Sequence, residues 1–162
     1  MIGNLTLRPA RPDDLALVDA LMARSFTRLL RRDYPPSLMV TVVPRIARAR
    51  PDLLASRRYF VVEGGEGRLV GAGGYSLGQG SVEAEVRQLA SDPDFVRQGI
   101  GRRLMEGIVA ATRAEGVRAL DCLATLTAAP FYAAMGFRSL GRVEVPMLPG
   151  LSFPVIKMRC DI

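Results

Sequence analysis

Two glycines at the expected start of a helix are the residues most clearly suited to chemistry. Gly99 and Gly101 stand in the stretch Val96-Arg97-Gln98-Gly99-Ile100-Gly101, after a strand-like segment and before a helical one. Glycine lets the backbone approach a ligand closely, and the first N–H groups of a helix have no partner within the helix. The helix dipole also favours negative charge there. With Arg97 and Arg102 beside it, this junction is predicted to bind a pyrophosphate.

Two common phosphate-binding motifs do not fit these residues. A dinucleotide-binding G-x-G-x-x-G would need a third glycine where Leu104 stands, and it normally follows an early strand. A Walker A loop would need Gly-Lys-Ser/Thr, but the one lysine of the chain is Lys157. The site is therefore predicted to bind the phosphates of a different cofactor.

Side chains available for proton transfer are restricted, because the chain has no histidine. This excludes Ser-His-Asp and Cys-His triads and histidine metal ligands. The two cysteines, Cys122 and Cys160, lie far apart and form no metal knuckle, so no metal site is predicted. Glu, Asp, Tyr or water must carry any proton transfer.

The basic character of the chain raises the alternative of a nucleic-acid-binding domain. The net charge is +6, and all but one of the 22 basic residues are arginines, which bind oxyanions well. The arginines are scattered, aromatic residues make up only 6%, and no zinc-finger, helix-turn-helix or RNA-sheet signature occurs. No apolar run approaches the roughly 18 residues of a membrane span. We therefore expect no nucleic-acid or membrane partner and a cytoplasmic location.

The elements that position these residues form one mixed α/β (α+β) domain over residues 1–162, in the order β-α-α-β-β-β-α-β-α-β-β. A helix is expected to follow Pro12-Asp13-Asp14, and a second to start at Ser37 in spite of Pro44. The strand pattern places Glu83, Glu85 and Arg87 on one side and Ala84, Val86 and Gln88 on the other. The expected strands are 5–8, 59–63, 69–75, 82–89, 119–123, about 143–145 and about 153–156, and the later helices are 99–115 and 128–135.

Two motifs in this order resemble those of the GNAT family of N-acetyltransferases. Residues 96–101 resemble the family signature Q/R-x-x-G-x-G/A, although Val96 occupies the usual Gln/Arg position. Residues 127–137 resemble the block N-A-x-x-F-Y-x-x-x-G-F, with Thr127 in place of the frequent Asn. Two motifs at compatible spacing are more specific than either alone.

The resemblance implies a GNAT-like, mostly antiparallel sheet of six to seven strands flanked by about four helices. It implies transfer of an acetyl group from acetyl-CoA to a primary amine of a small molecule or a peptide. Tyr132 then matches the family's general acid, and Glu85, with Glu83 as the alternative, matches its base. Dimers are common among similar proteins, so a homodimer is one alternative, but the sequence does not fix the oligomeric state. The implied cofactor-binding residues are Leu89, Ala90, Ser91, Val96, Arg97, Gln98, Gly99, Ile100, Gly101, Arg102, Thr127 and Phe131.

Each implied role has a structural alternative. Glu83 and Glu85 would otherwise be solvated charges, and Tyr132 would pack beside Phe131. The arginines at positions 24, 28, 31 and 32 either line an anionic acceptor's pocket or form a solvated helix face. A non-catalytic module that senses acyl-CoA is the main alternative to an enzyme.

Overall fold

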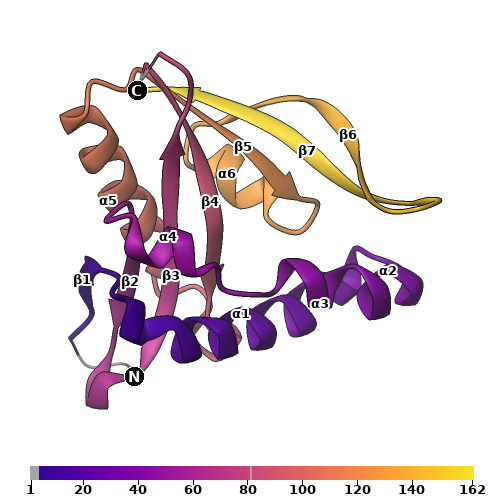
Figure 1. Cartoon of the computed structure of the whole chain (residues 1–162), viewed down its shortest axis with the longest axis horizontal. Helices are drawn as coiled ribbons and strands as arrows, with labels where there is room; N and C mark the ends of the chain where they lie inside the picture. Colours follow the sequence, from indigo (N-terminus) through magenta and orange to yellow (C-terminus); the bar gives the residue numbers. More distant parts are fainter. Residues whose placement is uncertain (1–3, 81) are drawn as a thin grey trace.

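A seven-stranded sheet forms the centre of the molecule, with the strand order β1-β2-β3-β4-β5-β7-β6. The computed structural model describes residues 4–80 and 82–162. Neighbouring strands are antiparallel except β4 and β5, which are parallel. The strands are β1 (Thr6–Pro9), β2 (Tyr59–Glu63), β3 (Leu69–Leu77), β4 (Glu83–Ser91), β5 (Ala119–Thr125), β6 (Arg138–Leu148) and β7 (Leu151–Asp161). Figure 1 shows them fanning from β1 to the β6–β7 hairpin.

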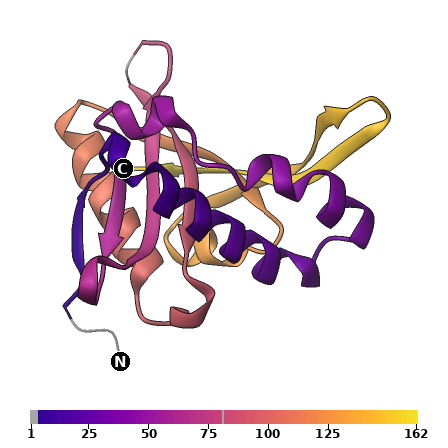
Figure 2. The ribbon, with the colours of Figure 1, turned by 60° about the horizontal axis from the view of Figure 1, so that its bottom comes forward.

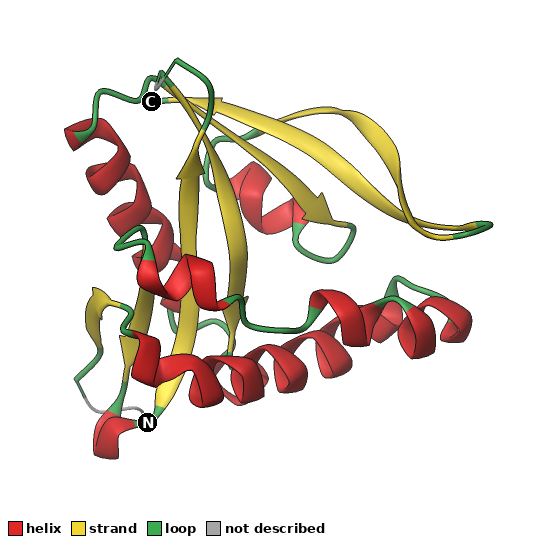
Figure 3. Ribbon diagram, viewed as in Figure 1, coloured by secondary structure: helices red, strands yellow, loops and turns green. Residues whose placement is uncertain are grey.

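Helices cover both faces of the sheet, as Figures 2 and 3 show. One face carries α1 (Leu15–Leu29), α2 (Pro36–Thr41), α3 (Val43–Ile46) and α4 (Pro51–Ala55); the other carries α5 (Ile100–Ala114) and α6 (Ala129–Ala134). On α5, Ile100, Leu104 and Ile108 recur every four residues, so they form one buried stripe against the sheet. In the described ranges, no helix combines the length and apolarity needed to cross a membrane.

The predicted order of elements is confirmed, and the second helix is the part that differs. Expected as one helix from Ser37, it is divided into α2, which ends at Thr41, and α3, which begins at Val43. Pro44 in the first turn of α3 has no N–H for a continuing helix, which explains the break. The short helix α4, which starts at Pro51, was not predicted. These pieces raise the number of α-helices above the expected four or so.

A β-bulge interrupts β4 and reverses the direction of its side chains. Ala90 pairs with Ala72 but Arg87 pairs with Gly74, so one β3 residue faces two residues of β4. Gln88 has φ of +44° at this point. The prediction that Gln88 lies on the same side as Ala84 and Val86 was wrong: its Nε2 donates to the Arg48 carbonyl oxygen at 2.8 Å, on the opposite side. The inserted residue breaks the two-residue alternation from which the prediction was made.

The parallel strands β4 and β5 separate beyond their first three pairs. Glu83 pairs with Ala119, Ala84 with Leu120 and Glu85 with Asp121, and no later pair joins the strands in the described residues. Figure 1 shows the two strands diverging from the end at which the C-terminus lies. The second half of β4 is therefore paired with β3 alone, and its other edge faces an opening in the sheet.

Candidate active site

The opening between β4 and β5 leads into a cavity of about 990 Å³. The start of α5 and the helix α6 close it on one face of the sheet, and α1, α3 and the β6–β7 hairpin close it on the other. Of the predicted site residues, these line it: Glu85, Leu89, Ala90, Ser91, Val96, Arg97, Gly99, Ile100, Gly101, Arg102, Thr127, Phe131 and Tyr132. Gln98 does not. It is exposed, because positive φ values at Arg97 and Gly99 turn the chain on either side of it.

The start of α5 offers a row of unpaired backbone donors. The first helical hydrogen bond is donated by the Arg103 amide to the Gly99 carbonyl oxygen at 2.9 Å. Within the described part of the chain, the amides of residues 96–102 have no hydrogen-bond acceptor. Arg97 and Arg102 line the cavity here, and neither forms an ion pair with a described residue. Donors, helix dipole and cations together make this end of the cavity suited to phosphate.

The two glycines of the predicted motif serve different purposes. Gly99 has φ of +76°, a left-handed conformation that other residues adopt at a cost, and its Cβ position is open. Gly101 has an ordinary helical conformation, but a Cβ there would lie 2.9 Å from Cε1 of Phe131. Gly99 is therefore required by the backbone, and Gly101 by close packing against α6.

Asp92 anchors the loop between β4 and α5, a role that sequence analysis missed. Its side chain is fully buried, accepts from the Asp94 amide at 2.9 Å, and accepts from Arg24 and Arg68 at 3.1 Å each. Burial opposes the carboxylate, but these three donors outweigh it and hold the pKa of Asp92 below its usual value. A buried acid directly before a proline at a strand end is the signal that could have identified it.

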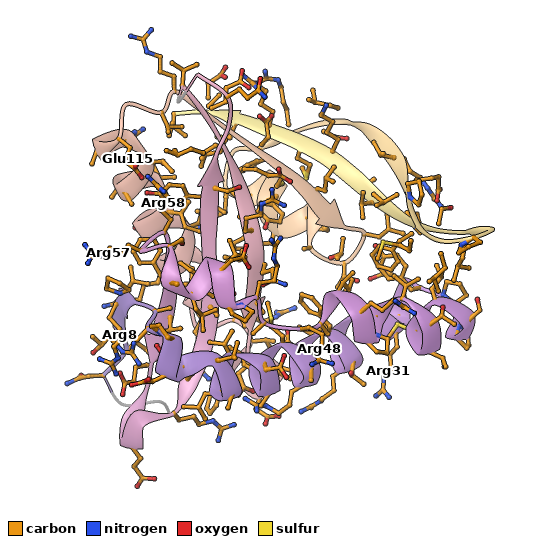
Figure 4. All side chains as sticks on the ribbon, in the orientation of Figure 1. Arg8, Arg31, Arg48, Arg57, Arg58 and Glu115 are labelled. Atoms are coloured by element: carbon orange, nitrogen blue, oxygen red, sulfur yellow. The ribbon has the colours of Figure 1, made fainter. Side chains whose placement is uncertain are left out.

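The predicted arginine cluster, with two members on α1 and two in the turn after it, does not line the cavity. Arg24 binds Asp92, and Arg28 donates to Asp94 at 2.7 Å. Both arginines therefore hold the loop between β4 and α5 from outside the cavity. Arg31, labelled in Figure 4, points away from the sheet at the end of α1. Of the two alternatives given for this cluster, the acceptor wall does not hold, because the buried face of α1 is formed by Val18, Leu21, Met22 and Ser25.

Tyr132 lies at the wall of the cavity among other aromatic rings. Its side chain is 5% exposed and packs edge-on against Phe131 and Phe137, with ring centroids 5.4 and 5.2 Å away. Its hydroxyl forms no hydrogen bond with a described residue, and the side chain lines the cavity. Burial raises the pKa of Tyr132 above its usual value.

The two candidate glutamates on β4 have different surroundings. Glu85 lines the cavity, and its Oε2 lies 3.3 Å from a guanidinium nitrogen of Arg87. Glu83 accepts from Arg159 at 2.9 Å, does not line the cavity, and shares that arginine with Asp121. Of the two, Glu85 alone has access to a molecule in the cavity.

Thr127 and Tyr34 connect the far wall of the cavity to the end of α1. The Thr127 hydroxyl donates to Asp33 at 2.7 Å, so this replacement of the frequent Asn keeps a polar contact within the protein. The Tyr34 hydroxyl donates to the Pro154 carbonyl oxygen and accepts from the Leu126 amide, at 2.7 and 2.8 Å. Its ring stacks on Phe153 at 4.3 Å. These contacts fix the distance between α1 and the β6–β7 hairpin.

Comparison with known proteins agrees with this geometry. An acetyltransferase (GNAT) domain model matches residues 55–139, which include β2 to α6. Among solved structures, a GCN5-related N-acetyltransferase from Rhodopseudomonas palustris is similar over 100% of this chain and 98% of its own, with a TM-score of 0.80 and 21% identity. PaiA N-acetyltransferase from Thermoplasma acidophilum, solved with coenzyme A, has a TM-score of 0.74 and 12% identity over 98% of this chain and 99% of its own. The ribosomal-protein-S18-alanine N-acetyltransferase from Escherichia coli has a TM-score of 0.67 and 20% identity over 98% and 94%.

Proposed function

The chain belongs to the GNAT family of acetyltransferases and is an acetyl-CoA-dependent enzyme, and on this premise we propose that it acetylates a primary amine by direct attack. The acceptor is a small molecule or a peptide. One observation carries the proposal: a single cavity joins the donor-rich start of α5 to Glu85 and Tyr132. Phosphate binding and proton transfer thus have access to the same cavity. Cytoplasmic location and a homodimer stay predictions from the sequence.

The residues present fit coenzyme A at the α5 end of the cavity. The free amides of residues 96–102 and the unpaired Arg97 and Arg102 suit its diphosphate, and the open Cβ position of Gly99 leaves room beside the backbone. The free edge of β4 after Glu85 provides backbone groups for the pantetheine arm, with Leu89, Ala90 and Ser91 lining the cavity. The cofactor supplies the acetyl group as an activated thioester.

Glu85 is proposed as the general base. A primary alkylammonium has a pKa of about 10 and must lose a proton before its nitrogen can attack. Glu85 receives this proton directly or through a water molecule, and its carboxylate lies 3.3 Å from Arg87. Glu83 is excluded from this role in the proposal because Arg159 holds it outside the cavity.

Tyr132 is proposed as the general acid for the leaving thiolate. Its hydroxyl has no partner among the described residues and the side chain lines the cavity, so the proton can be donated to a group that enters the cavity. The edge-on contacts with Phe131 and Phe137 fix the ring. Backbone amides near the β4 bulge are proposed to polarise the acetyl carbonyl, in the manner of an oxyanion hole.

A screen of primary amines tests the proposal against the alternative of an acyl-CoA sensor. The protein is incubated with acetyl-CoA and each amine, and the free thiol of coenzyme A is measured together with the mass of the acetylated amine. Enzymatic transfer requires both products in equal amounts. Tight binding of acetyl-CoA by calorimetry, with no acetylated product from any amine or peptide, would favour the sensor and overturn the proposed function.

A further inference from the structure

The part of the cavity opposite the phosphate end has an apolar wall. Phe26, Leu29 and Leu30 line it from the α1 segment, and Val145, Met147 and Phe153 line it from the β6–β7 hairpin. In Figure 1, α1 and the β6–β7 hairpin both extend toward the right of the view. The Tyr34 hydroxyl joins the two segments through its hydrogen bonds with Pro154 and Leu126. An acceptor bound here has its non-reacting body against hydrocarbon rather than water.

A group of arginines lies beside this apolar wall on the face opposite α5. Arg45, Arg48 and Arg50 line the cavity from α3 and the loop after it, and Arg87 lines it from β4. Glu85 is the one acidic residue that lines the cavity within the described chain. These arginines are separate from Arg97 and Arg102, which lie at the α5 end. The side chains that line the acceptor region therefore carry more positive than negative charge, and the phosphates of coenzyme A do not neutralise this excess.

Three of these four arginines already have an acidic neighbour. Arg48 lies 3.7 Å from Asp19, Arg50 binds Asp52 at 2.8 Å, and Arg87 lies 3.3 Å from Glu85. Arg45 forms no ion pair with any residue that the structure describes. It stands on α3 directly before Ile46, which packs with the apolar wall. Arg45 is thus the guanidinium available to an anionic group that enters the cavity.

We infer that the acceptor is an amine that also carries a carboxylate and an apolar body. Glu85 receives the ammonium end, Arg45 binds the carboxylate through charge-assisted hydrogen bonds, and the apolar body lies against Phe26, Leu29 and Phe153. The inference rests on the proposed function and narrows it to acidic apolar amines, such as apolar amino acids. A plain alkylamine would leave Arg45 unpaired and gain only the apolar contacts.

Two sets of matched amines test the inference. The first set is L-phenylalanine, L-phenylalanine amide and 2-phenylethylamine; the second is 4-(aminomethyl)benzoate and benzylamine, in which the carboxylate lies further from the nitrogen. The amide has the less basic amine, so poor turnover of the amide cannot come from harder deprotonation. We expect kcat/KM for at least one carboxylate to exceed that of its neutral partners by roughly tenfold or more.

Variants identify the guanidinium responsible. Arg45→Gln is expected to raise KM for the preferred carboxylate roughly tenfold while leaving KM for its neutral partner unchanged. Arg31→Gln removes the same charge from a position outside the cavity lining and should change neither value. An unchanged KM for the carboxylate in Arg45→Gln, or an equal rise for both partners, contradicts the inference.

The results separate the two proposals. Acetylation of neutral amines at rates equal to or above those of both carboxylates keeps the proposed function and overturns this inference. An enzyme that acetylates some other amine but neither carboxylate overturns it as well. Absence of any acetylated amine overturns the proposed function itself.

Discussion

The Tyr59 hydroxyl donates a hydrogen bond of 2.7 Å to the carbonyl oxygen of Gln88, across the bulge of β4. Gln88 is in a conformation that favours glycine, with φ of +44°, and its Oε1 is buried with no partner among the described residues. Gly73, opposite the bulge, has no space for a Cβ, which would lie 2.4 Å from Cδ1 of Leu89. The bulge is therefore a costly backbone shape that Tyr59 and Gly73 together maintain.

Loss of the Tyr59 hydroxyl is expected to affect both stability and turnover. Tyr59→Phe leaves the part-buried Gln88 carbonyl oxygen without its donor, so the free energy of unfolding should fall by about 1–3 kcal/mol. Because backbone amides near the bulge are proposed to polarise the acetyl carbonyl, kcat should fall while KM for acetyl-CoA stays nearly constant. Urea unfolding and steady-state kinetics give the two quantities.

The matched control for Tyr59 is Tyr75→Phe. Tyr75 donates its hydroxyl to Glu115, which also binds Arg58, and the Arg58–Glu115 pair is labelled in Figure 4. Since Tyr75 does not line the cavity, this variant should lose stability without a change in kcat. Equal kinetic effects in both variants would show that the bulge has no specific role.

Substitution of Gly99 should weaken binding of coenzyme A through the backbone. Gly99→Ala places a side chain at φ of +76°, which costs roughly 1–2 kcal/mol, and relief of this strain would move the free amides. Gly99→Asn should cost less, because asparagine tolerates the left-handed conformation better. The dissociation constant of coenzyme A, measured by calorimetry, should be lowest for the parent protein, higher for Gly99→Asn and highest for Gly99→Ala. The opposite ranking would mean that this turn does not shape the phosphate site.

Asp92 should make stability depend on pH in the acidic range. Its folded pKa lies below the unfolded value of about 4, so its contribution is fully present above that pH and is lost as the pH falls through the folded pKa. Asp92→Asn should lower the free energy of unfolding by about 2 kcal/mol at pH 7, since both half-exposed arginines lose their buried partner. The difference from the parent protein should narrow at pH 3 in urea unfolding.

Asp94→Asn is the control for Asp92. Asp94 also has an arginine partner, Arg28, but both of these side chains are about half exposed. The free energy of unfolding should therefore fall by less than about 0.5 kcal/mol at pH 7. A similar loss of unfolding free energy in Asp92→Asn and Asp94→Asn would contradict a special role for the buried carboxylate.

Tyr132→Phe should lower kcat by roughly tenfold to a hundredfold with little change in acetyl-CoA affinity. The phenyl ring keeps its edge-on contacts with Phe131 and Phe137, so the wall of the cavity is retained and only the proton is lost. Single-turnover kinetics combined with calorimetry separates the two effects. Unchanged turnover would eliminate Tyr132 as the acid.

Glu85→Gln should lower kcat/KM at pH 7, and the loss should shrink as the pH rises. Above the amine's own pKa of about 10, the acceptor is already deprotonated and needs no base. Glu83→Gln is the control, because Arg159 holds Glu83 outside the cavity and its loss should leave the pH profile unchanged. If Glu85→Gln lowered kcat/KM by the same factor at every pH, Glu85 would have a binding role rather than a role in proton transfer.

Local patterns were sufficient to predict the α5 end of the site. Gly99, the helix that follows it and the apolar stripe of Leu104 and Ile108 depend on residues close together in the chain, where conformational preference and spacing act directly. The same holds for most strands, whereas Glu85 and Tyr132 were expected near this segment from the family resemblance, and both line the same cavity. Two short motifs and the order of elements therefore indicated the GNAT fold and its cofactor.

Contacts between distant segments were decided by the tertiary structure. Asp92 meets Arg24 across 68 residues of sequence, and the bulge at Gln88 needs Tyr59 and the glycines of β3. Arg45 becomes part of the cavity only when α3 packs against α1 and the β6–β7 hairpin. No local preference encodes these contacts, since each depends on which surfaces pack together to bury apolar side chains. For the same reason, the phosphate end of the cavity was predictable from one stretch of residues, whereas the acceptor end is built from four segments whose charges and apolar walls meet only in the folded chain.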